Sequence, residues 1–440
     1  MTIRSKTTWR YLLHLSAQDT QISRWVFDRR LNLEKTTKEL INALSSGPVR
    51  QYILDHEHHD IREIILKNKE IFGVPTARLL EQISTRRKAK DKLPVYYEKG
   101  GIIYPPPEYF EQSSSQITAQ FKSQIVKDLV GNKDTSVADL TGGFGVDTYF
   151  LSKQVTKVHY VEPEKFLLEI ARHNHRLLGA ENIEYHPTTA EDFLASNRES
   201  FQVVYMDPSR RTEARKKIHA FEDSRPDVTE LASEILGRTT WQLIKASPLL
   251  DVQAGIAKLP LVSKVFVVSV NNENKELLFL SEKGFSGTPS VEALNLYKDR
   301  PRQTFKFSFP EERKQDVSFS DPLTYLYEPN ASILKAGAFK SVAANFNVKK
   351  IQTNTHLYTS DELIETFPGR VFLVERFVKP DRSEIKTFFP EGKANVTTRN
   401  YPLTPEALKK KTGLKDGGDK FLIGFSGMKK RFLVVATRLS

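Results

Sequence analysis

The chain has 440 residues, of which 39% are hydrophobic, and a formal net charge of +12. This length exceeds what one compact core usually holds, so several domains are expected. The sequence contains no cysteine, which excludes disulfides, cysteine-ligated zinc or iron–sulfur centres and any thiolate nucleophile. Residues 370–440 hold sixteen Lys or Arg and seven Asp or Glu. The basic character is therefore concentrated near the C-terminus and favours a polyanionic partner.

The N-terminus lacks a long apolar stretch followed by a small-residue cleavage site, and nowhere do about 18 uncharged apolar residues run together. We therefore expect a cytoplasmic protein with no membrane partner. No metal is expected either, because the His-rich cluster at residues 55–60 has no third ligand at a recognisable spacing.

Residues 1–92 are expected to form an N-terminal helical domain. Residues 30–47 and 58–73 place Leu or Ile three and four positions apart among charged residues, and each stretch ends in glycine. The charged stretch 84–94, which ends in proline, is interpreted as a linker to the next domain.

Residues 93–315 are expected to form an α/β domain. Three prolines at 105–107 are expected to prevent a helix before about Ser115. From Ser136 onward, short apolar runs alternate with helical patterns. This alternation is typical of a doubly wound sheet, whose ligands bind at the carboxyl ends of the strands.

The remaining chain is expected to form two smaller units, at residues 316–367 and 368–440. The first has the mixed pattern of a short α+β module. The second combines a strand at 370–377, a helix at 404–413 and two final apolar runs that should pair as a hairpin. We expect this second unit to be a compact, basic α+β domain.

A glycine-rich loop follows the first predicted strand of the α/β domain, in the sequence DLTGGFGVDTYFLS at residues 139–152. It contains no lysine, so it is not a triphosphate-binding P-loop. Thr148 stands where a dinucleotide loop needs its third glycine, and Asp139 would repel a pyrophosphate. S-adenosylmethionine, whose sulfonium is positive, suits an acidic loop better. Glu162 ends the next strand, where an acid can accept both ribose hydroxyls.

The tripeptide Asp207-Pro208-Ser209 follows a fourth predicted strand. A carboxylate and a rigid turn at this place would lie beside a methyl donor and could accept hydrogen bonds from the exocyclic amine of a base. The alternative is a helix N-cap at Asp207 with Pro208 in the first helical position.

These motifs, in the order EQSS, DLTGGFGVDT, YVEP, TTAEDF and MDPSRR, resemble the class I S-adenosylmethionine-dependent methyltransferases over about residues 100–285. The stretches EQSSSQITAQFK, KASPLLD, NNENKELLF and RNYPLTPEALKKKTGLKDGGDKFL resemble more closely a bacterial group of these enzymes. That group carries a ferredoxin-like insert and a C-terminal THUMP-like domain, and is distantly similar to cap-guanine N2-methyltransferases.

The resemblance implies a Rossmann-like α/β methyltransferase sheet, S-adenosylmethionine as cofactor and RNA, either tRNA or rRNA, as partner. The residues expected to bind the cofactor are Gln112, Ser113, Ser114, Asp139, Thr141, Gly142, Gly143, Gly145, Glu162 and Glu191. The residues expected at the reaction are Asp207, Pro208 and Ser209. The residues expected to contact the substrate or RNA are Arg210, Arg211, Lys245, Lys409, Lys410 and Lys411.

The sequence departs from the amino-methylating families after Asp207-Pro208. Those families usually have a second proline and an aromatic residue, whereas Ser209 and Arg210 stand here. Arg210 could stack its guanidinium on a flipped base, or grip phosphate together with Arg211. We expect methylation of an exocyclic or ring nitrogen of an RNA base. The alternatives are an inactive RNA-binding protein on a methyltransferase fold and a small-molecule methyltransferase.

Overall fold

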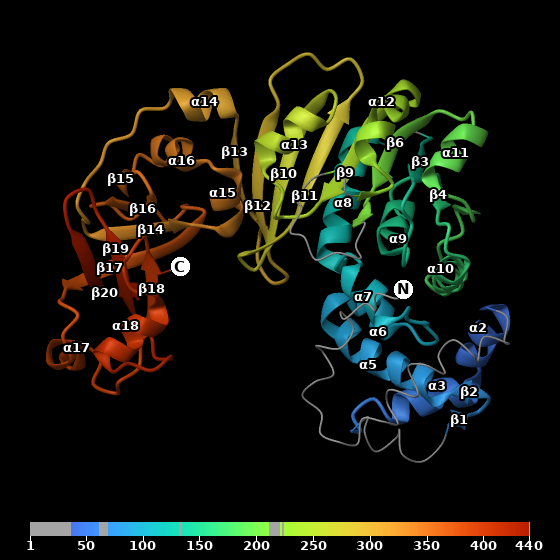
Figure 1. Ribbon diagram of the computed structural model, residues 1–440, viewed down its shortest axis with the longest axis horizontal. Helices are drawn as coiled ribbons and strands as arrows, with labels where there is room; N and C mark the ends of the chain where they lie inside the picture. The colour runs from blue at the N-terminus through green and yellow to red at the C-terminus, as the bar shows by residue number, and fades with distance from the viewer. Residues whose placement is uncertain (1–36, 61–68, 132–133, 211–220, 222–223, 440) are drawn as a thin grey trace, which may run out of the picture. The chain divides into compact units, whose positions relative to one another are not determined.

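The computed structural model describes residues 37–60, 69–131, 134–210, 221 and 224–439 (Figure 1). The chain divides into two compact units. The first contains Met1–Gln124, Gly142–Gln154 and Tyr160–Thr189, and the second contains Ile125–Thr141, Val155–His159 and Ala190–Ser440. None of the described helices is long and apolar enough to cross a membrane.

The first unit is mainly helical. Its helices are α2 (Thr37–Ser45), α3 (Gly47–Asp55), α5 (Thr76–Lys92), α6 (Pro94–Glu98), α7 (Pro107–Gln112), α9 (Val146–Ser152), α10 (Lys165–Leu177) and the first part of α8 (Gln116–Val130). Short strands β1 (Glu70–Ile71) and β2 (Val74–Pro75) pair with each other. One buried cluster includes Tyr96 of α6, Phe110 of α7, Tyr149 of α9 and Ile170 of α10. The N-terminal helices therefore share a core with the helix that follows the glycine loop.

Two expectations about this unit are wrong. The charged stretch expected as a linker lies largely in α5, because Leu79, Ile83 and Ala89 are buried at helical spacing while the basic side chains lie on the other faces. A helix also forms before Ser115: α7 begins at Pro107, in the first helical position, where the missing N–H of proline costs nothing.

A nine-stranded sheet has the order β13-β12-β10-β11-β9-β6-β3-β4-β5. Its strands are β3 (Ser136–Asp139), β4 (Lys157–Val161), β5 (Ile183–His186), β6 (Phe201–Met206), β9 (Thr239–Ala246), β10 (Val262–Val270), β11 (Glu273–Glu282), β12 (Ser290–Leu296) and β13 (Gln303–Phe307). Strands β3, β6 and β9 are parallel neighbours, whereas β11 is antiparallel to both β9 and β10. The predicted Rossmann-like α/β class is confirmed, with a mixed rather than purely parallel sheet. Helices α11 (Ala190–Ser196), α12 (Val228–Arg238) and α13 (Val252–Lys258) connect strands of this sheet.

The C-terminal part of the second unit is built on a seven-stranded sheet with the order β15-β16-β14-β17-β20-β19-β18. Its strands are β14 (Tyr325–Pro329), β15 (Lys349–Gln352), β16 (Thr355–Ser360), β17 (Gly369–Phe377), β18 (Asn395–Arg399), β19 (Lys420–Ser426) and β20 (Arg431–Arg438). Its helices are α14 (Phe309–Lys314), α15 (Ala331–Ala336), α16 (Phe339–Asn345), α17 (Arg382–Phe388) and α18 (Pro405–Thr412). The expected terminal hairpin is present, because β19 and β20 pair antiparallel.

Candidate active site

The glycine loop adopts a conformation that only glycine fits easily. Gly143 and Gly145 have φ of 56° and 81°, in the left-handed region. A Cβ on Gly142 would lie 2.3 Å from the Tyr160 ring, and one on Gly145 would lie 2.7 Å from the His175 ring. The glycines are therefore required by side chains packed behind the loop as well as by its backbone.

In the first unit, Glu162 is fixed against the loop. One carboxylate oxygen, Oε2, accepts a 2.8 Å hydrogen bond from the Gly143 N–H, and Oε1 accepts one of 2.8 Å from the Glu164 N–H. Burial raises the pKa of Glu162, while these two N–H groups act in the opposite direction. Each oxygen keeps a second lone pair, so the oriented carboxylate is able to accept further hydroxyl donors.

Two buried rings support the loop from behind. The Tyr160 hydroxyl donates to the Gly143 carbonyl at 2.6 Å. The His175 Nε2 lies 2.8 Å from the Gly145 carbonyl, and its Nδ1 lies 3.0 Å from the Tyr185 hydroxyl. Because a carbonyl only accepts, Nε2 carries the proton and Nδ1 accepts from Tyr185. Burial lowers the pKa of His175 to about 4, so this ring is neutral near pH 7.

The predicted segment Gln112–Ser114 divides in the structure. Gln112 is exposed, and the Ser113 hydroxyl donates to the Phe110 carbonyl at 2.8 Å. Ser114 is buried, and its hydroxyl donates to Asp147 at 2.8 Å and accepts from Lys122 at 2.6 Å. Lys122, only 1% exposed, also lies 3.0 Å from Asp147. Ser114 thus belongs to a buried charged network at the start of α9.

In the second unit, the beginning of the loop is tied to the end of β6. Asp139 is 1% exposed, and its Oδ1 accepts a 3.1 Å hydrogen bond from the Thr141 N–H. The Thr141 hydroxyl in turn accepts a 2.6 Å hydrogen bond from the Asp207 N–H. These contacts fix the backbone of Asp207 relative to the residue just before the first glycine.

Asp207 follows β6 directly, as the sequence predicted. Its Oδ2 lies 2.5 Å from the Lys245 Nζ of the neighbouring strand β9, and the two side chains are 26% and 15% exposed. The helix N-cap alternative is wrong, because Ser209 and Arg210 form the short strand β7 and not a helix. A partly exposed, cation-paired carboxylate therefore lies at the carboxyl end of the fourth strand.

The other residues predicted near Asp207 make no contact with its ion pair to Lys245 among the hydrogen bonds described. Ser209 is exposed and its hydroxyl donates weakly to the Arg225 carbonyl at 3.4 Å, while Arg210 pairs through its backbone with Ser224 of β8 (Ser224–Arg225). Arg211 lies outside the described residues. Asp251, the last residue of the KASPLLD stretch, caps α13 by accepting from the Ala254 N–H at 2.8 Å.

Glu191 is exposed in the first turn of α11. Lys409 lies 2.7 Å from Asp416, whereas Lys410 and Lys411 are exposed in the last turn of α18. Sequence reasoning missed Tyr160, Lys122 and His175, because nothing local distinguishes them from ordinary core or surface residues.

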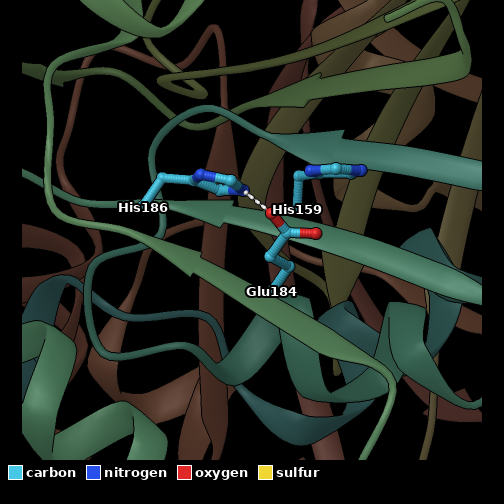
Figure 2. Close-up of side chains that lie close together, drawn as sticks. All are labelled: His159, Glu184 and His186. Carbon is cyan, nitrogen blue, oxygen red and sulfur yellow. Dashed lines mark ion pairs between the residues drawn. The ribbon is translucent and has the colours of Figure 1, made fainter. Parts of the chain in front are cut away.

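Histidines on β4 and β5 form two further charged contacts. Within the first unit, the Glu184 Oε1 and the His186 Nε2 of β5 are 3.5 Å apart (Figure 2). Within the second, the buried His159 of β4 lies 3.3 Å from Glu199. Each contact is an ion pair only when the histidine is protonated. Neither includes a residue predicted for the site.

Family models match two adjacent segments of the chain. A ferredoxin-like domain matches residues 325–368, and a THUMP-like domain matches residues 369–438. The crystal structure of a provisionally assigned methyltransferase from Porphyromonas gingivalis W83 is 29% identical in sequence. It covers 92% of this chain and 99% of its own, with a TM-score of 0.80. No curated protein sequence matches the chain.

Two other solved structures are similar over a smaller part. An rRNA methylase from Streptococcus thermophilus is 19% identical over 37% of this chain and 94% of its own, with a TM-score of 0.30. A provisionally assigned methyltransferase from Streptococcus mutans, in complex with S-adenosylhomocysteine, is 17% identical over 37% and 96%, with a TM-score of 0.29. The Porphyromonas match and the two family models confirm the resemblance in architecture: a methyltransferase fold with ferredoxin-like and THUMP-like parts.

Proposed function

Because the chain has a Rossmann-like methyltransferase fold and a THUMP-like segment, we propose that it is an S-adenosylmethionine-dependent methyltransferase acting on a base nitrogen of RNA. The observation that carries this proposal is the hydrogen bond between Thr141 of the loop and the Asp207 backbone. This hydrogen bond holds Asp207, at the carboxyl end of β6, beside the loop segment proposed to bind the donor. Ligands of doubly wound sheets bind at such strand ends.

The acidic character of the loop fits a cationic donor. Asp139 and Glu162 are both held in place by backbone N–H groups, and the segment 139–152 contains no lysine. S-adenosylmethionine, when bound, supplies an electrophilic methyl group on a positively charged sulfur. In this proposal Glu162 accepts the ribose hydroxyls, and the glycines allow the backbone to approach the donor closely.

Asp207 is proposed to orient the acceptor nitrogen. Lys245 engages Oδ2, which leaves Oδ1 to accept a hydrogen bond from an amino group of the base. The ion pair also fixes the direction in which the carboxylate points. Orientation of this kind lowers the barrier because the two reacting groups are held together before transfer begins.

RNA is favoured as the acceptor by charge and by domain type. Residues 370–440 carry nine more basic than acidic side chains, and Lys410 and Lys411 are exposed on α18. We propose that these lysines contact phosphates, which would make RNA affinity fall with rising salt.

The test is transfer of labelled methyl groups from S-adenosylmethionine to total RNA of a strain that lacks this gene. We expect label that nuclease removes and protease does not. Label in neither RNA nor protein, despite donor binding in calorimetry, would overturn the RNA assignment. Label in small molecules would identify a small-molecule acceptor instead.

Two matched variants test the role of Asp207 in that assay. Asp207→Asn removes the charge that pairs with Lys245 and is expected to lower kcat on the order of 100-fold. Asp299→Asn removes the same charge from an exposed position and should retain full activity. Equal activity of the two variants would remove Asp207 from the site.

A further inference from the structure

A groove on the seven-stranded sheet is lined by residues at the end of β17 and around the turn between β19 and β20. Its volume is about 390 Å³, and it is broadly open to solvent. The residues that matter to its chemistry are Phe377, Lys430, Arg431, Phe432 and Asp321, all of which line it. All of them belong to the second unit.

Phe377 presents an aromatic ring at this groove. The side chain is 50% exposed, although its backbone pairs with Val434 in the middle of the sheet. Its ring centroid lies 5.9 Å from that of Phe432, which is buried, at an interplanar angle of 54°. One side of the Phe377 ring is thus supported by the core, and the ring is held in place while half of its surface faces solvent.

Basic side chains flank this ring. Lys430 is 63% exposed, and its Nζ lies 5.1 Å from the Phe432 ring centroid and 3.3 Å from Asp321. Arg431, which also lines the groove, is exposed as well. Asp321 is the single acid among the lining residues that the structure describes. An exposed ion pair of this kind contributes little, so a phosphate is able to compete for Lys430.

We propose that this groove binds a single-stranded RNA segment, with one base stacked on Phe377 and the adjoining phosphates paired with Lys430 and Arg431. An aromatic ring beside cations is the arrangement that holds single-stranded nucleic acid without reading its sequence. The groove is a second contact for the RNA proposed above, apart from Asp207, and it rests on that function only for the identity of the physiological RNA.

The test is fluorescence anisotropy with the full chain and a labelled oligoadenylate of about 12 nucleotides. Phe377→Ala is expected to weaken binding at least about 5-fold, the loss typical of one stacked base. Phe377→Trp should bind as well as the wild type, because it keeps a π-face. Phe377→Leu should bind as weakly as the alanine variant, since it keeps apolar area without a ring.

Charge is tested separately by salt dependence. The double variant Lys430→Ala and Arg431→Ala should reduce the slope of log affinity against log salt by about 1.4, because each single-strand phosphate contributes about 0.7. Lys306→Ala with Lys314→Ala removes two exposed lysines outside this groove and should leave the slope unchanged.

Three results would overturn the proposal: unchanged binding by Phe377→Ala, wild-type binding by Phe377→Leu, or equal weakening by both double variants. The second result would show that apolar area at position 377, and not a π-face, supports binding. This assay needs no methyl donor, so its outcome is independent of the labelling experiment. Phe377-dependent binding without methyl transfer would support RNA binding at the groove and overturn the proposal that the protein is an RNA methyltransferase.

Discussion

The glycine loop and the C-terminal groove use similar residue types in opposite settings. Behind the loop, Lys122, Tyr160 and His175 are buried, and each has a fixed partner on or near the loop. At the groove, Phe377 and Lys430 are at least half exposed. Buried polar groups carry large penalties when their partners are lost, whereas exposed groups do not. Substitutions of the buried groups behind the loop should therefore change stability, and substitutions of the exposed groove residues should change only binding.

The largest expected effect is at Lys122. Lys122→Met leaves Asp147 without its buried cation and is expected to lower the free energy of unfolding by about 3–5 kcal/mol. Chemical denaturation measures this loss. The double variant with Asp147→Asn should recover part of it, because no unpaired charge then remains. A loss below about 1 kcal/mol in the single variant would mean that the loop, like the groove, contributes little to the stability of the fold.

The next effect is a pH dependence that comes from His175. Its pKa is lowered by burial to about 4 from an ordinary value of 6.5, so the unfolded chain binds more protons between these values. Stability from the neutral ring is complete above pH 6.5 and is lost as the pH falls toward 4, by up to about 3 kcal/mol.

Denaturation of wild type and His175→Gln at several pH values measures the part of the stability that depends on the neutral His175 ring. The difference between the two curves should shrink as the pH falls from 6.5. His356 has a similarly low pKa, but it is present in both proteins and cancels in the difference. A constant difference would mean that His175 does not titrate as a buried neutral ring.

A smaller effect is expected at Tyr160. Tyr160→Phe removes the hydroxyl that donates to the Gly143 carbonyl and should cost about 1 kcal/mol of stability. It should also weaken donor binding in calorimetry. Tyr358→Phe is the matched control, because this buried tyrosine of β16 in the seven-stranded sheet donates its hydroxyl to the Phe339 carbonyl at 2.8 Å. The control should lose similar stability and no donor affinity.

The smallest effect is expected at the groove. Phe377→Ala should change the free energy of unfolding by less than about 0.5 kcal/mol, as exposed substitutions usually do. Phe432→Ala, at its buried neighbour, should cost about 3–5 kcal/mol. Similar losses in both variants would show that Phe377 is a core residue. The groove would then contribute to stability as the loop does.

Sequence patterns predicted the parts of this fold that depend on neighbouring residues. The apolar runs became strands, and Asp207 lies at the end of β6 because the run before it is short, largely buried and rich in valine and aromatic residues. The helix α5 was misread, since its charged residues conceal the buried positions Leu79 and Ile83. A local pattern cannot show which face of a charged segment meets a core.

The side chains that support the glycine loop could not be predicted from local sequence patterns. His175 is 30 residues from Gly145 in sequence, and Lys122 is 25 from Asp147, so only tertiary packing brings them together. Lys245 is an intermediate case, because the register that pairs Met206 with Ile244 places the next two residues side by side. The sequence predicted a role for Lys245 from the KASPLLD stretch, but its pairing with Asp207 depends on the strand register.

The seven-stranded sheet limits how the C-terminal part can be divided. The boundary between the ferredoxin-like and THUMP-like matches falls at residues 368 and 369, directly before β17. Strand β17 pairs with β14 on one side and β20 on the other, so the boundary runs through the middle of one sheet. A fragment that begins at residue 369 would expose the β17 edge that β14 covers, and such an open edge promotes aggregation. The two matched segments therefore form one folding unit, because separating them would leave an unpaired strand edge on each.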